Sequence, residues 1–361
     1  MIYLNANRIF ATKRNTDPKL SLEILGSLIP DLSQTKLIYV IGDGAETSSS
    51  YLSEPLLLAD VTVLRCRASA RIDAKQKFLI NGESISPAEL CSSIERLTTR
   101  ILDAGAISNP ASNRLFDILP LSCEELSFLL AAELAAECAC DAVIFEISSY
   151  TFKNVISKLS IAPLCAVIAS LSEQCADELI GLLPLGTKAA VRYSDKVSFD
   201  FISNDLSSSN TLIGTVSPNK ITSGRITSFG ANFFYNSFQF DIKSIEKDDV
   251  IFASLAAEAL MTLSRLSELF VPYPLIYQGI LQASPLFSAE LFSISPLIYT
   301  KISDTCTSLP DSSLFDEKRL IFIYESDDVR AIISKRDFDV AVIVGSYDFI
   351  QSTKKQLTSF K

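Results

Sequence analysis

Near its N-terminal end the chain contains a short apolar run that ends in two glycines and is followed by hydroxylated residues. The run, 37–41, is typical of a buried parallel strand, and Gly42 and Gly44 interrupt it. The hydroxyl groups of 47–50 can cap and open a helix that continues to Leu58. A strand, a glycine turn and a helix N-terminus form the backbone of a phosphate-binding loop, because backbone amides and the helix dipole then point at one anion.

The loop carries a negative charge, which is unfavourable for phosphate binding. Its candidate nucleotide-binding residues are Gly42, Asp43, Gly44, Ala45, Glu46, Thr47 and Ser48. Glu46 stands where such a loop needs a lysine, and two charges about 4 Å apart interact by roughly 4 kcal/mol at an effective dielectric of about 20. The reversed charge therefore predicts that the loop binds ATP poorly or not at all. Thr47 and Ser48 can hold Mg²⁺, but N-capping explains these two residues equally well.

Composition places the chain among globular proteins and argues against several functions. Its 361 residues suffice for two or three domains, with 48% apolar and 20% charged residues. The net charge of −10, with no basic cluster, argues against nucleic acid as a partner. The chain contains no histidine, which excludes Ser–His and Cys–His nucleophile systems and any imidazole metal ligand.

The sequence predicts neither export nor a membrane span. Its first residues contain no apolar core of the secretory kind. Residues 269–289 carry no charge, but Pro272, Pro274 and Pro285 argue against an apolar helix of about 20 residues. The eight cysteines include no C-x-x-C pair, and buried free thiols explain them better than disulfides or a metal site. We therefore expect a soluble, cytoplasmic protein.

Strand-like and helix-like segments alternate along the chain, which predicts an α/β fold with a mostly parallel sheet. Ser86 is expected to cap a helix, and Ser122 with Glu125 forms an expected capping box. Further strands are expected at 61–65, 141–147 and 164–169, and further helices at 87–103, 122–138, 173–182 and 248–270. A smaller antiparallel layer is expected from 188–201, 211–216 and 226–242. We expect two domains, residues 1–284 and residues 285–361.

In this order the segments resemble the Mur ligase superfamily, which includes peptidoglycan-precursor amino-acid ligases and folylpolyglutamate synthase. The glycine loop lies over the family's G-T-N-G-K pattern without a gap, and Glu46 falls in the lysine column. Glu146 falls on the family's strand-end carboxylate, and 78–90 is similar to a folylpolyglutamate synthase segment. Two further signatures, over 169–177 and 304–310, lack their histidines. The resemblance implies a P-loop-type ATPase domain, the Mur ligase central domain, with a smaller Rossmann-like C-terminal α/β domain.

The resemblance also implies a chemistry. ATP phosphorylates a carboxylate and an amine then displaces phosphate, with a cation and Mg²⁺ at the transferring phosphate. Glu146 keeps an oxygen that Mg²⁺ can use, and it can equally be a strand-end carboxylate that caps a neighbouring loop. Where the family has a metal-binding histidine, this chain offers Cys175 or Tyr150. Cysteine is a poor ligand for Mg²⁺, and a small buried thiol explains Cys175 better.

The loop lysine, the metal-site histidine and the C-terminal histidine are missing together. The leading hypothesis is therefore a ligase-fold pseudoenzyme with a degenerate P-loop and no cofactor, which acts as a structural or protein-binding component. Its candidate contact with a protein partner is the stretch 269–300, for which a buried domain junction is the more frequent explanation. The alternative is an active ATP- and Mg²⁺-dependent amide ligase with a remodelled site into which Lys36 or Lys75 reaches. A third reading is a regulatory sensor that binds nucleotide or another anion without turnover.

Overall fold

Strand β1 (Lys36–Ile41) lies inside a large sheet and is buried on both faces, as its uninterrupted apolar sequence predicts. Side chains alternate across a strand, so Ile38 and Val40 belong to one hydrophobic core while Leu37, Tyr39 and Ile41 belong to another. The structure is a computed structural model, and it describes residues 32, 34–68, 74–103, 121–148, 161–169, 173–194, 211–227, 230–244, 247–284, 290–294, 297–302, 320–324, 327–335 and 339–358.

The large sheet is mostly parallel, which confirms the predicted α/β class. Among the described residues its strand order is β4-β3-β2-β5-β1-β6-β7-β8. Strands β2, β5, β1, β6, β7 and β8 pair in parallel, and the β3–β4 hairpin adds an antiparallel edge beside β2. The strands other than β1 are β2 (Val63–Cys66), β3 (Phe78–Ile80), β4 (Glu83–Ser84), β5 (Ala142–Ile147), β6 (Cys165–Ile168), β7 (Ala189–Tyr193) and β8 (Leu212–Val216).

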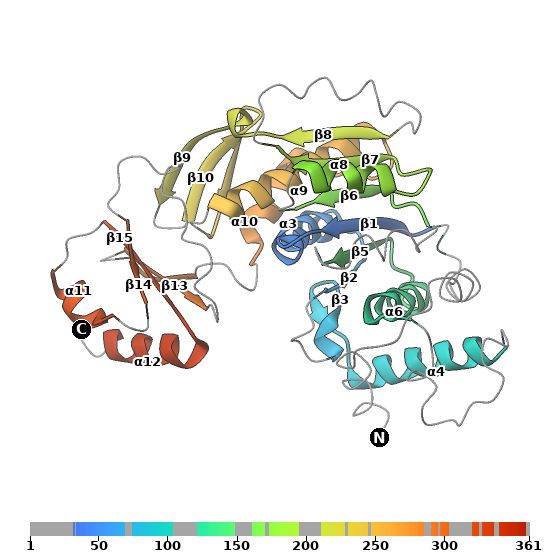
Figure 1. Ribbon diagram of the computed structural model, residues 1–361, viewed down its shortest axis with the longest axis horizontal. Helices are drawn as coiled ribbons and strands as arrows, with labels where there is room; N and C mark the ends of the chain where they lie inside the picture. The colour runs from blue at the N-terminus through green and yellow to red at the C-terminus, as the bar shows by residue number, and fades with distance from the viewer. Residues whose placement is uncertain are drawn as a thin grey trace.

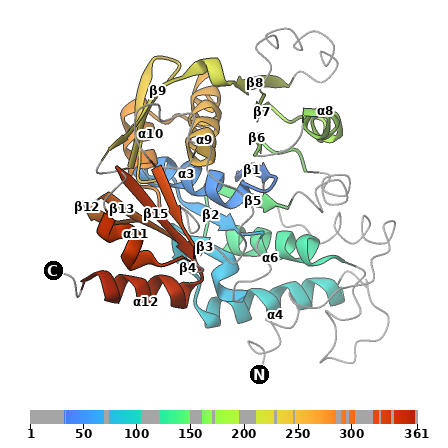
Figure 2. The same cartoon turned by 60° about the vertical axis from the view of Figure 1, so that its left-hand side comes forward.

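Helices cover both faces of this sheet (Figures 1 and 2). One core forms with α3 (Ala45–Leu58), α9 (Lys247–Arg265) and α10 (Tyr273–Gln282). The opposite core forms with α4 (Pro87–Asp103), α6 (Cys123–Glu137) and α8 (Glu173–Leu182). Both faces of the parallel strands are therefore shielded from water, which is the usual arrangement of a parallel sheet. Two short 3₁₀ helices, η1 (Ala74–Lys77) and η3 (Pro218–Lys220), lie in connections.

Two helices begin with the caps that their sequences predict. Before α6, the Ser122 backbone N–H donates to the Glu125 carboxylate at 2.5 Å, and the Glu125 backbone N–H donates to the Ser122 hydroxyl at 3.2 Å. Before α4, Ser86 and Glu89 make the same two hydrogen bonds at 2.6 and 3.2 Å. Such caps satisfy backbone N–H groups that have no partner inside the helix.

The predicted antiparallel layer is only partly right. Residues 226–242 do contribute to a separate antiparallel sheet of β9 (Ile221–Thr227), β10 (Gly230–Tyr235) and β11 (Phe238–Ile242). Strands β7 and β8, however, join the large sheet in parallel. The sequence pattern differs from that of a central parallel strand because β8, at an edge of the sheet among the described residues, is only partly buried: Leu212 is exposed and Ile213 and Thr215 are half-buried, while Val216 is buried.

The proline-marked stretch contains a helix that the sequence did not predict. Helix α9 ends at Arg265 rather than at residue 270, and α10 begins at Tyr273 with Pro272 as its N-cap. Proline is tolerated in the first helical turn because the N–H groups there have no partner inside the helix. Helix α10 packs against α3, with Ile276 and Ile280 buried, while Phe270 just before it is 71% exposed. No helix in the described part of the chain is long and apolar enough to cross a membrane.

A small α/β unit follows and has a hydrophobic core of its own. It comprises β12 (Glu290–Ile294), β13 (Leu297–Ile302), β14 (Leu320–Ile323), α11 (Val329–Lys335), β15 (Val340–Gly345) and α12 (Tyr347–Thr358), drawn in orange and red in Figure 1. Its strand order is β12-β13-β15-β14, and β15 pairs in parallel with both neighbours. Residues 285–289, where the chain is predicted to divide, lie outside the described residues, so the division at 284 stays a prediction.

Candidate functional site

The glycine loop connects β1 to α3 as the sequence predicts, but the helix begins earlier. Gly42 has a φ of +118°, which favours glycine, and its N–H donates to the carbonyl of Ile147 at 3.0 Å. Gly44 is the N-cap and α3 starts at Ala45, with no side-chain hydrogen bond to the cap. Thr47 and Ser48 therefore lie in the first turn of the helix, and the prediction that they cap it is wrong.

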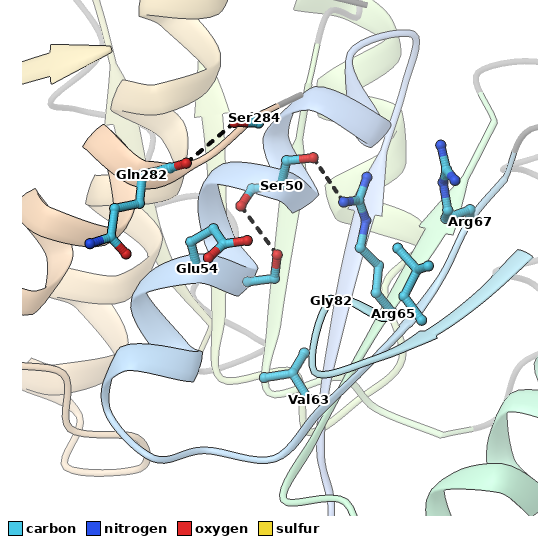
Figure 3. Close-up of a pocket in the computed structure, with 10 residues that line it drawn as sticks. Ser50, Glu54, Val63, Arg65, Arg67, Gly82, Gln282 and Ser284 are labelled. Atoms are coloured by element: carbon cyan, nitrogen blue, oxygen red, sulfur yellow. Dashed lines mark hydrogen bonds between the residues drawn. The ribbon is translucent and has the colours of Figure 1, made fainter. Parts of the chain in front are cut away.

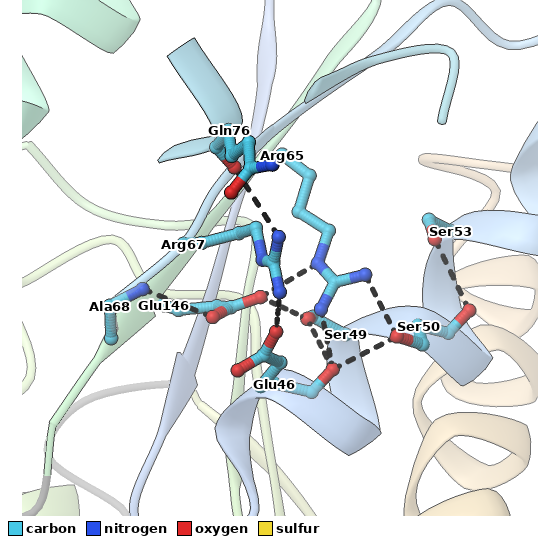
Figure 4. Close-up of polar contacts among 9 residues, drawn as sticks. All are labelled: Glu46, Ser49, Ser50, Ser53, Arg65, Arg67, Ala68, Gln76 and Glu146. Carbon is cyan, nitrogen blue, oxygen red and sulfur yellow. Dashed lines mark hydrogen bonds and ion pairs between the residues drawn. The ribbon is translucent and has the colours of Figure 1, made fainter. Parts of the chain in front are cut away.

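Glu46 contacts two arginines, Arg65 in β2 and Arg67 just after it. Arg65 lies in β2 and reaches α3, where the Ser50 hydroxyl accepts from its Nη1 at 2.8 Å (Figure 3). Its Nη2 donates to the carbonyl of Glu46 at 2.6 Å. Arg67, which follows β2, forms an ion pair with the Glu46 carboxylate through Nη2 (Figure 4). The reversed charge of the loop is therefore matched inside the protein.

Glu146 at the end of β5 completes this cluster. Its Oε1 accepts from Arg65 Nε at 2.7 Å and from the Ser49 hydroxyl, and its Oε2 accepts from the backbone N–H of Ala68 at 3.1 Å. Both carboxylate oxygens are thus used, one of them on the loop after β2, as the capping alternative predicts. In the described part of the chain, no three residues of the His, Cys, Asp and Glu types gather so that they could hold a metal.

The four charged side chains of this cluster are buried and balanced. Side-chain exposure is 10% for Arg65, 0% for Glu146, 6% for Arg67 and 13% for Glu46. Burial lowers the pKa of Arg67, and the Glu146 carboxylate opposes that shift. The two guanidinium groups and the two carboxylates of this cluster cancel in formal charge. Removing one partner of such a buried pair typically costs about 3–5 kcal/mol.

Phe252 covers one side of the glycine loop. A Cβ built on Gly44 would lie 2.1 Å from Cζ of the Phe252 ring, so this ring is packed directly on the glycine. Phe252 belongs to α9 and is 9% exposed. Behind the loop, the hydroxyl of Ser48 is buried and has no hydrogen-bond partner among the described residues. Close packing with α9 therefore accounts for a glycine at position 44.

The other predicted contributors lie elsewhere or outside the described residues. Lys36 stands at the opposite end of β1 from the loop and pairs with Glu268 at 3.4 Å, so the prediction that it reaches into the loop is wrong. Cys175 is half-buried in α8. The side chain of Lys75, Tyr150 and residues 304–310 lie outside the described residues. That Gly42 to Ser48 bind a nucleotide, and that Glu146 binds a metal, stay predictions.

A cavity of about 300 Å³ opens beside the charge cluster (Figure 3). It lies between α3, β2, the β3–β4 hairpin and the end of α10. Its lining residues are Ser50, Ser53, Glu54, Val63, Arg65, Arg67, Leu79, Gly82, Gln282 and Ser284. Arg65 and Arg67 thus belong both to the charge cluster and to the wall of the cavity.

Sequence reasoning missed Arg65 and Arg67, although a signal was present. The segment Val63-Leu-Arg-Cys-Arg67 places a positive charge at two alternate positions of an otherwise apolar strand. Burying an ionised side chain is costly unless it is paired, so charges inside such a strand require acidic partners. The partners cannot be identified from the sequence, because Glu146 is 81 residues from Arg65 along the chain.

Comparison with solved structures identifies the fold. The folylpolyglutamate synthetase from Lactobacillus casei matches with a TM-score of 0.69 and 13% identity, over 99% of this chain and 100% of that one. The folylpolyglutamate synthase from Thermotoga maritima matches with a TM-score of 0.65 and 14% identity, over 99% and 97%. The enzyme from Mycobacterium tuberculosis, solved with ADP, matches with a TM-score of 0.66 and 13% identity, over 95% and 81%.

These likenesses show that the chain has the fold of the folylpolyglutamate synthetases over nearly its whole length. The resemblance in the sequence is thus confirmed at the level of fold. No protein-family model matches the chain. No curated protein sequence matches it either. At 13% identity, shared structure carries no assignment of activity, because one fold supports many functions.

Proposed function

We propose that this chain is a Mur ligase-fold pseudoenzyme that lacks ATP-dependent ligase activity and serves as a structural or protein-binding component. The observation that supports the proposal most is the ion pair between Glu46 and Arg67. A phosphate-binding loop needs a cation at the position of Glu46, and here that position holds a buried carboxylate with its own partner.

Two further observations point the same way. A phosphate bound at the loop would place its negative charges close to the Glu46 carboxylate. Like charges repel, so this contact would cost binding free energy. Glu146, which the resemblance places in the Mg²⁺ site, uses both its oxygens for Arg65, Ser49 and the backbone of Ala68. Freeing that carboxylate for a metal would leave the buried Arg65 guanidinium without a charged partner.

The second candidate is an active amide ligase that uses ATP and Mg²⁺ through a remodelled site. One observation favours it: Arg65 and Arg67 bring two guanidinium groups to the end of the loop. Arginine binds phosphate in a two-pronged geometry, so Arg67 can in principle replace the missing lysine by exchanging Glu46 for phosphate. Structures with the same fold have been solved with AMPPCP and with ADP.

A nucleotide titration separates these proposals. Calorimetry and thermal unfolding with millimolar Mg-ATP should show no saturable binding and no stabilisation of this chain, while the Mycobacterium tuberculosis enzyme serves as the positive control. Ligand binding raises stability with the ratio of ligand concentration to Kd, so weak binding remains detectable. Saturable binding with release of phosphate would contradict the pseudoenzyme proposal and support the ligase. Binding without phosphate release would instead indicate a nucleotide sensor.

The protein-binding part of the proposal concerns the stretch 269–300. Helix α10 buries Ile276 and Ile280 against the large domain, so these residues are not available to a partner. Phe270 is 71% exposed and is the candidate anchor within this stretch. Substitution of Phe270 by Ser should release a partner that co-purifies with the full chain, whereas substitution of the exposed Leu185, which lies elsewhere, should not. Equal recovery with both variants would remove 269–300 as the contact.

A further inference from the structure

The cavity beside α3 lies away from the glycine loop. Ser50, Ser53 and Glu54 line it from the sixth, ninth and tenth positions of α3, which starts at Ala45 (Figure 3). At 1.5 Å per residue, Glu54 lies about 14 Å along the helix axis from that start. A ligand in this cavity would therefore lie along the side of α3 rather than at its N-terminus.

One negative charge of the cavity wall has no ion-pair partner among the described residues. Glu54 is half-buried, and within the described part of the chain no hydrogen bond or ion pair reaches its carboxylate. The two arginines of the wall are matched by acids outside the cavity, Arg65 by Glu146 and Arg67 by Glu46. The charge that remains unmatched in the wall is therefore negative, and it favours a cation in the cavity.

The serine hydroxyls of the wall already donate their protons inside the protein. The Ser53 hydroxyl donates to the Ser50 carbonyl at 3.2 Å, and the Ser50 hydroxyl donates to the Glu46 carbonyl at 3.1 Å. The Ser284 hydroxyl donates to the Gln282 carbonyl at 3.4 Å. A hydroxyl group has one proton and two lone pairs, so these groups have only acceptor capacity left for a ligand. Together with the Glu54 carboxylate they call for a ligand that donates hydrogen bonds.

An ammonium group of the protein itself uses acceptors at one end of this wall. Lys243 Nζ donates to the Gln282 carbonyl at 2.6 Å and to the Ser284 hydroxyl at 3.0 Å. Lys243 is exposed, so water and salt screen its charge, whereas Glu54 is half-buried and is screened less. The oxygen atoms of this wall are thus of the kind that binds an ammonium group, and Glu54 is left for a second one.

The volume and the apolar side of the cavity limit the rest of the ligand. About 300 Å³ lies at the lower end of the roughly 300–1,000 Å³ range of small-molecule pockets. Val63, which is buried, and Leu79, which is half-buried, supply apolar surface for a short carbon chain. A nucleotide with its base, sugar and phosphates exceeds this space, while an ammonium group on a short alkyl chain fits it.

We infer that this cavity binds a small primary amine in its ammonium form, with its nitrogen at Glu54 and Ser53 and its carbon chain against Val63 and Leu79. An ammonium group is a compact cation with three donors and no acceptor, which matches a carboxylate surrounded by hydroxyl lone pairs. The site goes beyond the function proposed above and stands whether or not the glycine loop binds ATP.

Ligand-observed NMR titration of the full chain tests this inference with three probes of similar size, n-butylammonium, n-butanol and butyrate, at constant ionic strength. Butylammonium should bind saturably with a Kd in about the millimolar range, as expected for a ligand with so few atoms. Butanol lacks the charge and butyrate reverses it, so neither should show saturable binding.

Two charge variants separate a site at Glu54 from general attraction of a cation to a chain with a net charge of −10. Glu54→Gln removes the charge without breaking an ion pair of the described residues and should weaken butylammonium binding about tenfold or more. The matched control Glu95→Gln removes one exposed carboxylate from α4, which packs on the opposite face of the sheet, and should bind as the unaltered chain does.

A third variant keeps the test valid if Glu54→Gln does not fold. Ser53→Ala retains the carboxylate but removes the neighbouring acceptor, so butylammonium should bind several-fold more weakly. The inference is overturned if butylammonium does not bind, or if butanol or butyrate binds as tightly. It is also overturned if the folded cavity variants bind like the unaltered chain, or if Glu95→Gln weakens binding as much as they do.

Discussion

The Arg67 guanidinium pairs with the Glu46 carboxylate across 21 residues of chain, joining the strand-β2 end to the first turn of α3. The negative charge of Glu46 is therefore neutralised by a partner inside the protein. The two residues form one half of a four-charge cluster whose other half is Arg65 with Glu146. The acidic Glu46 of the loop and the two arginines at β2, Arg65 and Arg67, therefore belong to one buried charge cluster.

The first prediction concerns how much the ion pair between Glu46 and Arg67 contributes to the free energy of unfolding. Glu46→Gln should lower the free energy of unfolding by about 3 kcal/mol or more, because it leaves a buried guanidinium group without its counter-charge. The matched control is Glu137→Gln, which breaks an ion pair with Arg96 in which both side chains are 37% exposed. Exposed pairs contribute about 1 kcal/mol or less. Chemical denaturation measures both, and equal losses would contradict the buried cluster.

The second prediction uses a charge exchange. Glu46→Lys should destabilise the protein more than Glu46→Gln, because it places a third cation beside Arg65 and Arg67. Adding Arg67→Glu restores one opposite pair, so the double variant should be more stable than Glu46→Lys alone. Coupling of contacting residues is typically about 0.5–3 kcal/mol, and a double-mutant cycle from urea unfolding measures it. Additive losses would show that the two side chains do not interact.

The third prediction concerns the close packing of α10 on α3. A Cβ at Gly279 would lie 2.3 Å from the backbone nitrogen of Pro55, so Gly279→Ala should destabilise the protein by roughly 1–3 kcal/mol through overpacking. The control is Gly181→Ala in α8, where a Cβ meets nothing within 4 Å. Alanine is the better helix former, so that change should stabilise by about 0.5–1 kcal/mol. Thermal unfolding should show shifts of opposite sign.

The fourth prediction concerns pH. Burial raises the pKa of the Cys66 and Cys165 thiols from 9.0 to about 12. Below pH 9 both the folded and the unfolded state keep these protons, so the thiols add no pH dependence there. Between about pH 9 and pH 12 the unfolded state ionises first, so the free energy of unfolding should fall, by roughly 1 kcal/mol per thiol at pH 10.

Chemical denaturation at pH 8 and pH 10 measures this fall in the free energy of unfolding. The double variant Cys66→Ala/Cys165→Ala should show a smaller fall between the two pH values. Because the thiolate is the reactive form, both thiols should also resist alkylation in the folded protein, while the half-buried Cys91 reacts. Rapid alkylation of Cys66 or Cys165 without unfolding would contradict their burial.

Much of the fold could be predicted from local patterns. The apolar run of β1, the capping box at Ser122 and Glu125, and the strand at β5 follow from residues that are near each other in sequence. Helix α10 does not follow from the same patterns, because Pro272 and Pro274 argue against a long apolar helix, whereas a short helix accepts proline in its first turn. The direction of β8 does not follow from its sequence, because this partly buried edge strand lacks the continuous apolar run of a central parallel strand.

Local residue patterns are enough to predict the glycine turn at Gly42, the helix that follows it and the negative charge at Glu46. The partners of that carboxylate depend on long-range packing. Strand β5 lies between β1 and β2, so the ends of three parallel strands bring Glu46, Glu146, Arg65 and Arg67 together from distant parts of the chain. Strand order depends on long-range packing, which local residue patterns do not encode. The same packing places the Phe252 ring directly on Gly44.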